Sequence, residues 1–188
     1  MSESNKPSRS GPEILHAPWR DPYMQQLSAG ETADAQGVER ATFLAAYWAN
    51  PADDARNHVI ARVGEGDCAG MILLNRYPYA NGHLLIALGD ARPRLMDYSV
   101  AQRAALWRLV DTAAELCERT LRPQGLNIGV NQHEAAGAGV PGHLHAHIVP
   151  RWHGDVNFMT AVAQVRVIPG ALEQMAGRYR EVWGEMKA

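Results

Sequence analysis

Histidine alternates with an apolar residue in the run His143-Leu-His-Ala-His147, and apolar residues continue through positions 148 to 150. Alternation with period two is typical of a β-strand, and it places His143, His145 and His147 on one face of a sheet. Same-face neighbours on a strand are separated by roughly 6.5–7 Å. We therefore expect a strand that is buried on one side and presents a row of three imidazoles on the other.

The composition excludes several classes of partner. With 188 residues, of which 46% are hydrophobic, the chain can bury the core of one globular domain. A net charge of −2 gives no overall attraction for nucleic acid or for an anionic membrane, and no apolar run approaches the roughly 20 residues of a membrane span. Cys68 and Cys117 are far apart, and residues 1–10 lack the apolar core of a secretory signal. We expect a cytoplasmic protein that binds neither nucleic acid nor membrane.

The chain divides into three regions, which are a disordered tail over residues 1–13, an N-terminal extension over 14–57 and a compact domain over 58–188. Strand-like runs cover residues 59–63, 69–74, 84–88 and 126–130, and residues 163–167 could add another. Ser99 and Gln102 have capping-box spacing before a long amphipathic helix that should end near Arg122, and Pro169 fits the first turn of a C-terminal helix. This order predicts an α+β fold with a largely antiparallel sheet.

A glycine-rich segment, Asn131–Gly142, directly precedes the histidines and contains Gly137, Gly139 and Gly142. Small residues let backbone N–H groups approach an oxyanion closely, and consecutive N–H groups can form an anion-binding nest. Such a segment is commonly only a connection between two strands. Because it leads into three imidazoles, we interpret it as a site for a phosphate-bearing substrate.

The three histidines allow three interpretations. They could be ordinary exposed or hydrogen-bonded strand residues. They could bind zinc, for which His83, His133 or His153 would supply a further ligand. A neutral imidazole, whose pKa is near 6.5, is also a competent nucleophile toward phosphorus, and neighbouring imidazoles could orient it and protonate the leaving group.

Several segments together resemble one known family. The run His143-Leu-His-Ala-His-Ile-Val149 resembles the signature of the histidine triad (HIT) superfamily. Further segments resemble the branch that includes bacterial diadenosine tetraphosphate phosphorylases and related hydrolases; they cover residues 17–23, 75–86, 127–131, 136–139 and 149–158. The resemblance spans roughly residues 15–185 and implies a HIT-like fold with a long central helix and a C-terminal helix.

The resemblance also implies roles for individual residues. His145 would be the nucleophile that forms a nucleotidyl-histidine intermediate, His147 would aid departure of the leaving group, and His143 and His83 would orient the row. The residues implied in substrate binding are Asn75 near the ribose, Asn131, Gln132, Ala138 and Gly139 at the phosphates, and Trp152, which could stack on a base or only pack.

The chain departs from this branch at a zinc site. Many relatives carry a Cys-x-x-Cys pair where this chain has Ala41-Thr-Phe-Leu44, and Ala91 stands where a further zinc histidine is usual. Only His143 remains of that set. We therefore expect no structural zinc and no required cofactor, with Mg²⁺ as a possible companion of a polyphosphate substrate.

The phosphate segment departs from the branch at two positions. His133 stands where relatives commonly have glycine, and it is either an exposed residue or a donor that alters substrate preference. Gly139 stands where some phosphorylases carry serine, which puts phosphorolysis in doubt.

The resemblance predicts an enzyme that cleaves dinucleoside polyphosphates, above all diadenosine tetraphosphate, through phosphorolysis or hydrolysis. The alternatives are an adenosine phosphoramidate hydrolase and a nucleotide-binding module without turnover. Like its relatives, the chain is expected to form a homodimer or homotetramer. The sequence does not decide between phosphate and water as the acceptor, and it does not define the base or the length of the phosphate chain.

Overall fold

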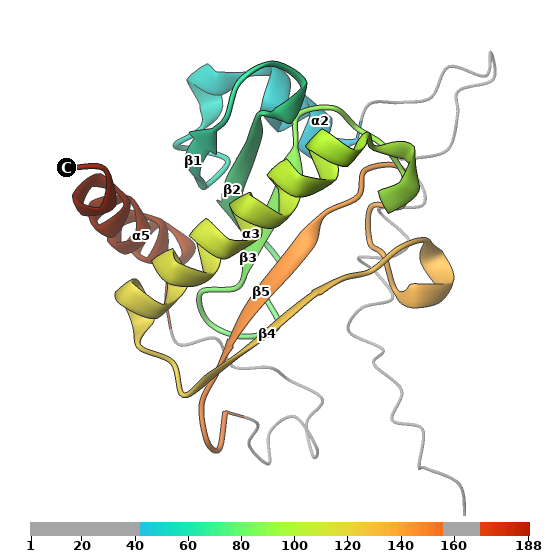
Figure 1. The fold of residues 1–188 in the computed structure, drawn as a ribbon. Helices are drawn as coiled ribbons and strands as arrows, with labels where there is room; N and C mark the ends of the chain where they lie inside the picture. Colours follow the sequence, from blue (N-terminus) through green and yellow to red (C-terminus); the bar gives the residue numbers. More distant parts are fainter. Residues whose placement is uncertain (1–41, 156–169) are drawn as a thin grey trace, which may run out of the picture.

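The computed structural model describes residues 42–155 and 170–188, which build one antiparallel sheet covered by helices (Figure 1). The strands lie in the order β1-β2-β3-β5-β4. Their bounds are β1 Val59–Val63, β2 Gly70–Leu74, β3 Leu84–Leu88, β4 Gly125–Val130 and β5 Ala146–Arg151. The helices are α2 Phe43–Ala49, α3 Val100–Leu121 and α5 Leu172–Lys187, and four short 3-10 turns lie between these elements. The predicted α+β class and the largely antiparallel sheet are confirmed.

The long helix α3 forms because its start is capped and one of its faces is apolar. The Ser99 hydroxyl accepts the Gln102 N–H, and the Gln102 side chain accepts the Ser99 N–H, as the capping-box spacing predicted. The helix ends at Arg122, whose backbone is left-handed, immediately before Pro123. Both predicted ends are therefore confirmed.

Helices α3 and α5 cover one face of the sheet, as Figure 1 shows, and enclose the larger core. Leu106, Leu109 and Val110 from α3 pack against Ile72 and Ile86 of the sheet. This core also receives Met175, Ala176 and Tyr179 from α5. No helix within the described residues is long and apolar enough to cross a membrane.

The opposite face of the sheet carries a smaller core and the histidines. Helix α2 seals the β1–β3 end of this face through Leu44, which is completely buried with Met71, Leu73 and Leu85. In the antiparallel register, Leu85 pairs with His147, so the His147 side chain shares this face. The α2 face therefore holds apolar packing at one end and imidazoles at the other.

The prediction that all three histidines lie on a strand is wrong in part. Strand β5 begins at Ala146, so His143 and His145 precede it. The ladder between β3 and β5 ends at the pair Ile86 and Ala146. Beyond that pair the chain leaves the ladder, and the Leu144 N–H donates to the carbonyl of Arg92 at 2.8 Å.

Further expectations concern the two ends of the chain. Helix α5 begins at Leu172 with Ala171 as its N-cap, so the predicted first turn at Pro169 lies too early by about a turn. The possible strand over 163–167, the tail over 1–13 and most of the 14–57 extension lie outside the described residues. The predicted domain boundaries at 13 and 57 therefore remain predictions.

Candidate active site

His83 and His147 form a hydrogen-bonded pair whose protons are set by the backbone. The Tyr79 N–H donates to His83 Nδ1 at 3.1 Å, so this nitrogen carries no proton. The proton of the neutral His83 ring is then on Nε2, which lies 3.0 Å from His147 Nδ1 and donates to it. His147 Nδ1 is consequently an acceptor, and the neutral His147 ring carries its proton on Nε2.

Asn75 holds the far side of this pair. Its Oδ1 accepts the Tyr77 N–H at 2.9 Å, which orients the amide so that Nδ2 faces His83 Nδ1 at 3.2 Å. Asn75 is nearly buried, with an exposed fraction of 9%. The Tyr79 ring packs against the His83 and His147 rings, with centroid separations of 4.9 and 6.0 Å. The structure thus places Asn75 directly against His83.

His145 has the opposite arrangement of its proton. Its Nδ1 lies 2.8 Å from the carbonyl oxygen of His143, which can only accept, so Nδ1 carries the proton and Nε2 keeps its lone pair. Burial lowers the pKa of His145, which favours this neutral form. The centroids of the His145 and His147 rings are 4.9 Å apart in an edge-to-face arrangement. A nucleophilic nitrogen and an N–H donor therefore belong to adjacent rings.

The His143 ring is held at both of its nitrogens. Nε2 lies 2.8 Å from the Leu88 carbonyl and donates to it, which leaves Nδ1 to accept from the Thr42 hydroxyl at 3.2 Å. The ring is completely buried, and burial lowers its pKa. His143 is thus a neutral residue with a fixed ring, and its carbonyl accepts from His145.

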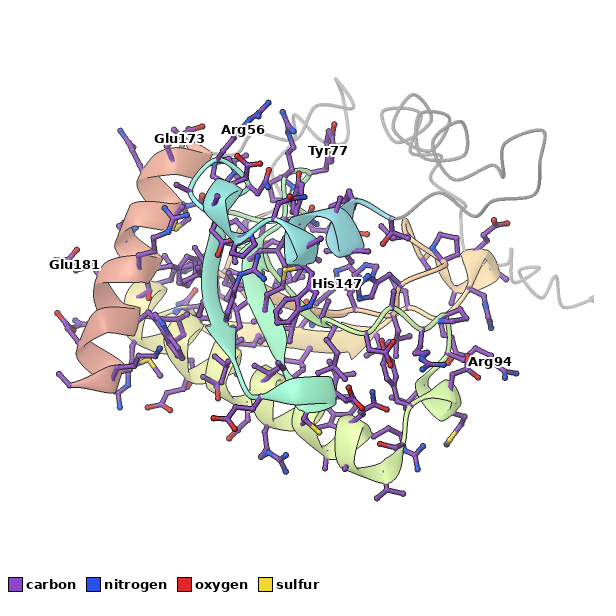
Figure 2. All side chains as sticks on the ribbon, turned by 90° about the horizontal axis from the view of Figure 1, so that it is seen from above. Arg56, Tyr77, Arg94, His147, Glu173 and Glu181 are labelled. Carbon is purple, nitrogen blue, oxygen red and sulfur yellow. The ribbon has the colours of Figure 1, made fainter. Side chains whose placement is uncertain are left out.

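A glycine lies across from His147 in the sheet. Gly129 of β4 pairs with His147 of β5, and among the described residues no atom lies within 4 Å of the place where a Gly129 side chain would begin. Figure 2 shows His147 within the molecule, whereas Glu173 and Glu181 project outward from α5 at the rim.

Two of the predicted substrate-binding residues, Asn131 and Gln132, directly follow strand β4. Asn131 directly follows Val130, whose ladder partner Ala146 is the neighbour of His145, so Asn131 lies at the same end of the sheet. The Gln132 side chain accepts the Leu95 N–H at 3.0 Å, and it therefore anchors the segment to the chain before α3.

The Ala138 backbone, which was expected to meet phosphate, has a partner within its own segment. The Ala138 N–H donates to the His133 carbonyl at 3.2 Å, and Ala138 is buried, so the segment is folded on itself at this point. Gly139 follows at half-buried depth, and the Trp152 N–H meets the Asp155 carboxylate at 3.4 Å in the turn after β5. His133 is exposed with a positive φ of 64°.

The donor set does not fit a metal at this place. Within residues 42–155 and 170–188 there is no group of three or more His, Cys, Asp or Glu side chains that could hold an ion. Both nitrogens of His143 face protein partners, and Ala91 has no donor side chain. Zinc ligation through His143 would require the loss of one of these two hydrogen bonds.

Thr42 and Tyr79 contact the histidines and were not identified from the sequence. Threonine before an apolar helical run is a recognisable N-cap, and the Thr42 hydroxyl does accept the Ala45 N–H at 3.2 Å. Nothing in the sequence indicates that the same hydroxyl reaches a histidine 101 positions later. The contact arises only when α2 packs on the sheet.

Comparison with known proteins agrees with this geometry. Residues 63–154 match the HIT domain family. The chain is 38% identical over 100 residues to a protein of Mycobacterium tuberculosis named AP-4-A phosphorylase, covering 53% of this chain and 51% of that one. It is 33% identical over 82 residues to an asymmetrical bis(5'-nucleosyl)-tetraphosphatase of Schizosaccharomyces pombe, covering 44% of each. The chain therefore spans about half the length of these relatives or less.

Solved structures share the fold. A hypothetical histidine triad nucleotide-binding protein of Sulfolobus tokodaii aligns with a TM-score of 0.59 at 20% identity, covering 76% of this chain and 93% of that one. A Zn-bound histidine triad family protein of Mycobacterium smegmatis aligns with a TM-score of 0.58 at 22% identity, covering 76% and 94%. Residues 63–154 of this chain therefore match a HIT domain, and the solved structures share its fold.

Proposed function

We propose that the protein cleaves dinucleoside polyphosphates, with diadenosine tetraphosphate as the first substrate to test, through a nucleotidyl group carried on His145. The observation that carries this proposal is the proton arrangement of the two adjacent rings. His145 Nε2 holds a lone pair because Nδ1 donates to the His143 carbonyl, while His147 holds a proton on Nε2. A nucleophile and a hydrogen-bond donor for the departing oxygen are therefore present together while both rings are neutral.

In the first step, His145 Nε2 attacks the α-phosphorus and forms a P–N bond. The P–O bond to the rest of the phosphate chain breaks, and the departing oxygen leaves as an anion that accepts a hydrogen bond from His147 Nε2–H. In the second step, water or phosphate attacks the same phosphorus, the P–N bond breaks and returns the lone pair to His145 Nε2, and the proton of an attacking water passes to solvent. His83 stabilises the His147 ring in both steps through its Nε2–H, and no step uses a metal.

The names of the relatives support the substrate class. One is named a phosphorylase of AP-4-A and another an asymmetrical tetraphosphatase, and both names describe cleavage of a dinucleoside tetraphosphate. The two names correspond to phosphate and water as acceptors. Gly139 lacks the hydroxyl that could hold a phosphate acceptor, and this favours water.

A product assay tests the proposal. Diadenosine tetraphosphate is incubated with the protein in the presence and in the absence of phosphate, and the nucleotides are separated by chromatography. Hydrolysis gives AMP and ATP, whereas phosphorolysis gives ADP and ATP. We expect His145→Ala to lower turnover by about 10³-fold or more while nucleotide binding persists. Wild-type rates in that variant would refute the covalent mechanism, and binding without turnover in the wild type would indicate a nucleotide-binding module.

We also propose that the domain carries no structural zinc and requires no cofactor. The proposal is supported by the two occupied nitrogens of His143. Mg²⁺ would act only by accompanying the phosphates of the substrate. Stoichiometric zinc in protein purified without added metal would refute it.

A homodimer or homotetramer is the proposed assembly. Strand β4 pairs only with β5 among the described strands, so its outer edge can accept a second strand, and Ile128 on it is 47% exposed. Light scattering coupled to size-exclusion chromatography checks this, and a monomer at micromolar concentration would contradict it.

A further inference from the structure

We infer that Thr42 is a positioning residue for the nucleophile, because its hydroxyl fixes the His143 ring and through it the backbone that holds His145. This inference rests on the proposed role of His145. It adds a residue from the N-terminal extension, outside residues 63–154, to the support of the triad. Thr42 touches no reacting atom in this scheme, so it positions rather than catalyses.

The need for such support follows from where the sheet ends. Strand β5 begins at Ala146, so His145 lacks the ladder hydrogen bonds that fix His147. Residues 143–145 are held by other groups. The His143 N–H donates to the Val140 carbonyl at 3.2 Å, and the Leu144 N–H donates to the Arg92 carbonyl at 2.8 Å.

The His143 side chain completes this support. Its ring joins β3, through the Leu88 carbonyl, to the first turn of α2, through Thr42. The His143 carbonyl in turn accepts the Nδ1–H of His145 at 2.8 Å and so determines which nitrogen of His145 can attack. A movement of His143 would therefore change both the place and the proton arrangement of His145.

Thr42 suits this task because its hydroxyl has two partners and its helix is anchored. The oxygen accepts the Ala45 N–H at 3.2 Å, and the hydroxyl hydrogen is directed to His143 Nδ1. The helix cannot shift easily, since Leu44 is completely buried in the smaller core. The hydrogen bond thus connects a fixed helix end to a residue that lies outside the ladder.

The Thr42–His143 hydrogen bond lies where the family resemblance implies a zinc site in relatives. The resemblance described above implies that residues 41–44 correspond to a Cys-x-x-Cys pair of relatives, and His143 is the sole member of the ligand set it implies in this chain. A hydroxyl–imidazole hydrogen bond here gives Nδ1 of His143 a partner within the chain. Orientation of the first histidine therefore does not depend on a metal in this protein.

The test compares three variants of the full chain. Thr42→Val keeps the size and the methyl group but removes the hydroxyl, Thr42→Ser keeps the hydroxyl, and Ser99→Ala removes an N-cap from α3 without contacting the histidines. We expect Thr42→Val to lower kcat on diadenosine tetraphosphate by about 10-fold or more with an unchanged Kd for the nucleotide. Thr42→Ser and Ser99→Ala should stay within about twofold of the wild type.

Imidazole ¹⁵N NMR of the free protein supplies a readout that needs no substrate. The wild type should show His145 protonated on Nδ1 and His143 on Nε2. Thr42→Val should shift the His145 signals toward a mixture of tautomers, and Thr42→Ser should restore them. Unchanged His145 signals together with wild-type kcat in Thr42→Val would overturn the inference. If the wild type does not turn over the dinucleotide, the proposed function fails, and the NMR comparison alone decides the role of Thr42.

Discussion

Tyr179 offers a quantitative test of how the C-terminal helix is joined to the site. It is completely buried in α5, and its hydroxyl donates to the Gly82 carbonyl at 2.8 Å, one residue before His83. Its oxygen also lies 3.3 Å from Cys117 Sγ. In Tyr179→Phe, the buried Gly82 carbonyl loses this donor, and water has little access to replace it because Gly82 is itself buried.

The expected loss is the cost of leaving a buried acceptor without its partner, about 1–3 kcal/mol. With a urea m-value of about 2 kcal/mol/M, a loss of 2 kcal/mol would lower the midpoint of unfolding by about 1 M. The packing of the ring is retained, so the cavity contribution should be small. Urea titrations followed by tryptophan fluorescence measure this difference directly.

Tyr98 supplies the matched control. Its hydroxyl donates to the Asp90 carbonyl, also at 2.8 Å, but Asp90 is half-buried, so water can reach its carbonyl after the change. Tyr98→Phe should therefore cost only about 0.5–1.5 kcal/mol. The reasoning would be refuted if Tyr179→Phe were no more destabilising than Tyr98→Phe at equal m-values.

Three further outcomes are expected. Burial lowers the pKa of His143 and His145 below the unfolded value of about 6.5, so the stability that these two rings contribute is full above that pH and falls as the pH decreases below it. The urea midpoints measured at pH 7.5 and pH 5.5 should therefore differ less in His143→Gln than in the wild type. Burial raises the pKa of Tyr98 to about 12, so its contribution to the free energy of unfolding is full below pH 10 and is lost as the pH rises toward 12. In Tyr98→Phe, the free energy of unfolding should therefore fall less between pH 10 and pH 12 than it does in the wild type. Gly89→Ala would place a methyl group against the Trp48 ring and should cost about 1–3 kcal/mol of unfolding free energy, measured by thermal or urea unfolding. No measurable cost would show that the ring can move aside.

Local patterns predicted the parts of this fold that local physics determines. The capping box at Ser99 and Gln102 needs only residues within one turn, and the strand runs at β1 and β3 need only a continuous apolar stretch between turns. Each was therefore predicted with bounds that match the structure. The start of β5 was not, because it depends on where the partner strand β3 stops pairing.

The arrangement of the candidate site depends on groups that a motif does not contain. The alternating histidines identify which rings meet, and the rings of His145 and His147 do lie side by side. Which nitrogen of each ring carries the proton is set by the Tyr79 N–H and by the carbonyls of His143 and Leu88. Nearly every residue type has a backbone N–H and a carbonyl group, so the sequence does not indicate which of these groups will contact a histidine ring.

The tautomers of the histidine rings should resist most side-chain replacements, because backbone groups set them. Backbone donors and acceptors persist when the side chains that carry them are replaced, so the tautomers of His83 and His145 should survive most substitutions at Tyr79 and Leu88. Besides the histidines themselves, Asn75 and Thr42 are described residues that reach the rings of His83 and His143 through side chains. Asn75 adds a second donor to a His83 nitrogen whose tautomer Tyr79 already determines, and Thr42 donates to the His143 nitrogen that the Leu88 carbonyl leaves unprotonated. What Thr42 adds is therefore the position of the His143 ring, which carries the acceptor of His145 Nδ1–H, and Thr42 lies outside the segment that carries the histidine motif.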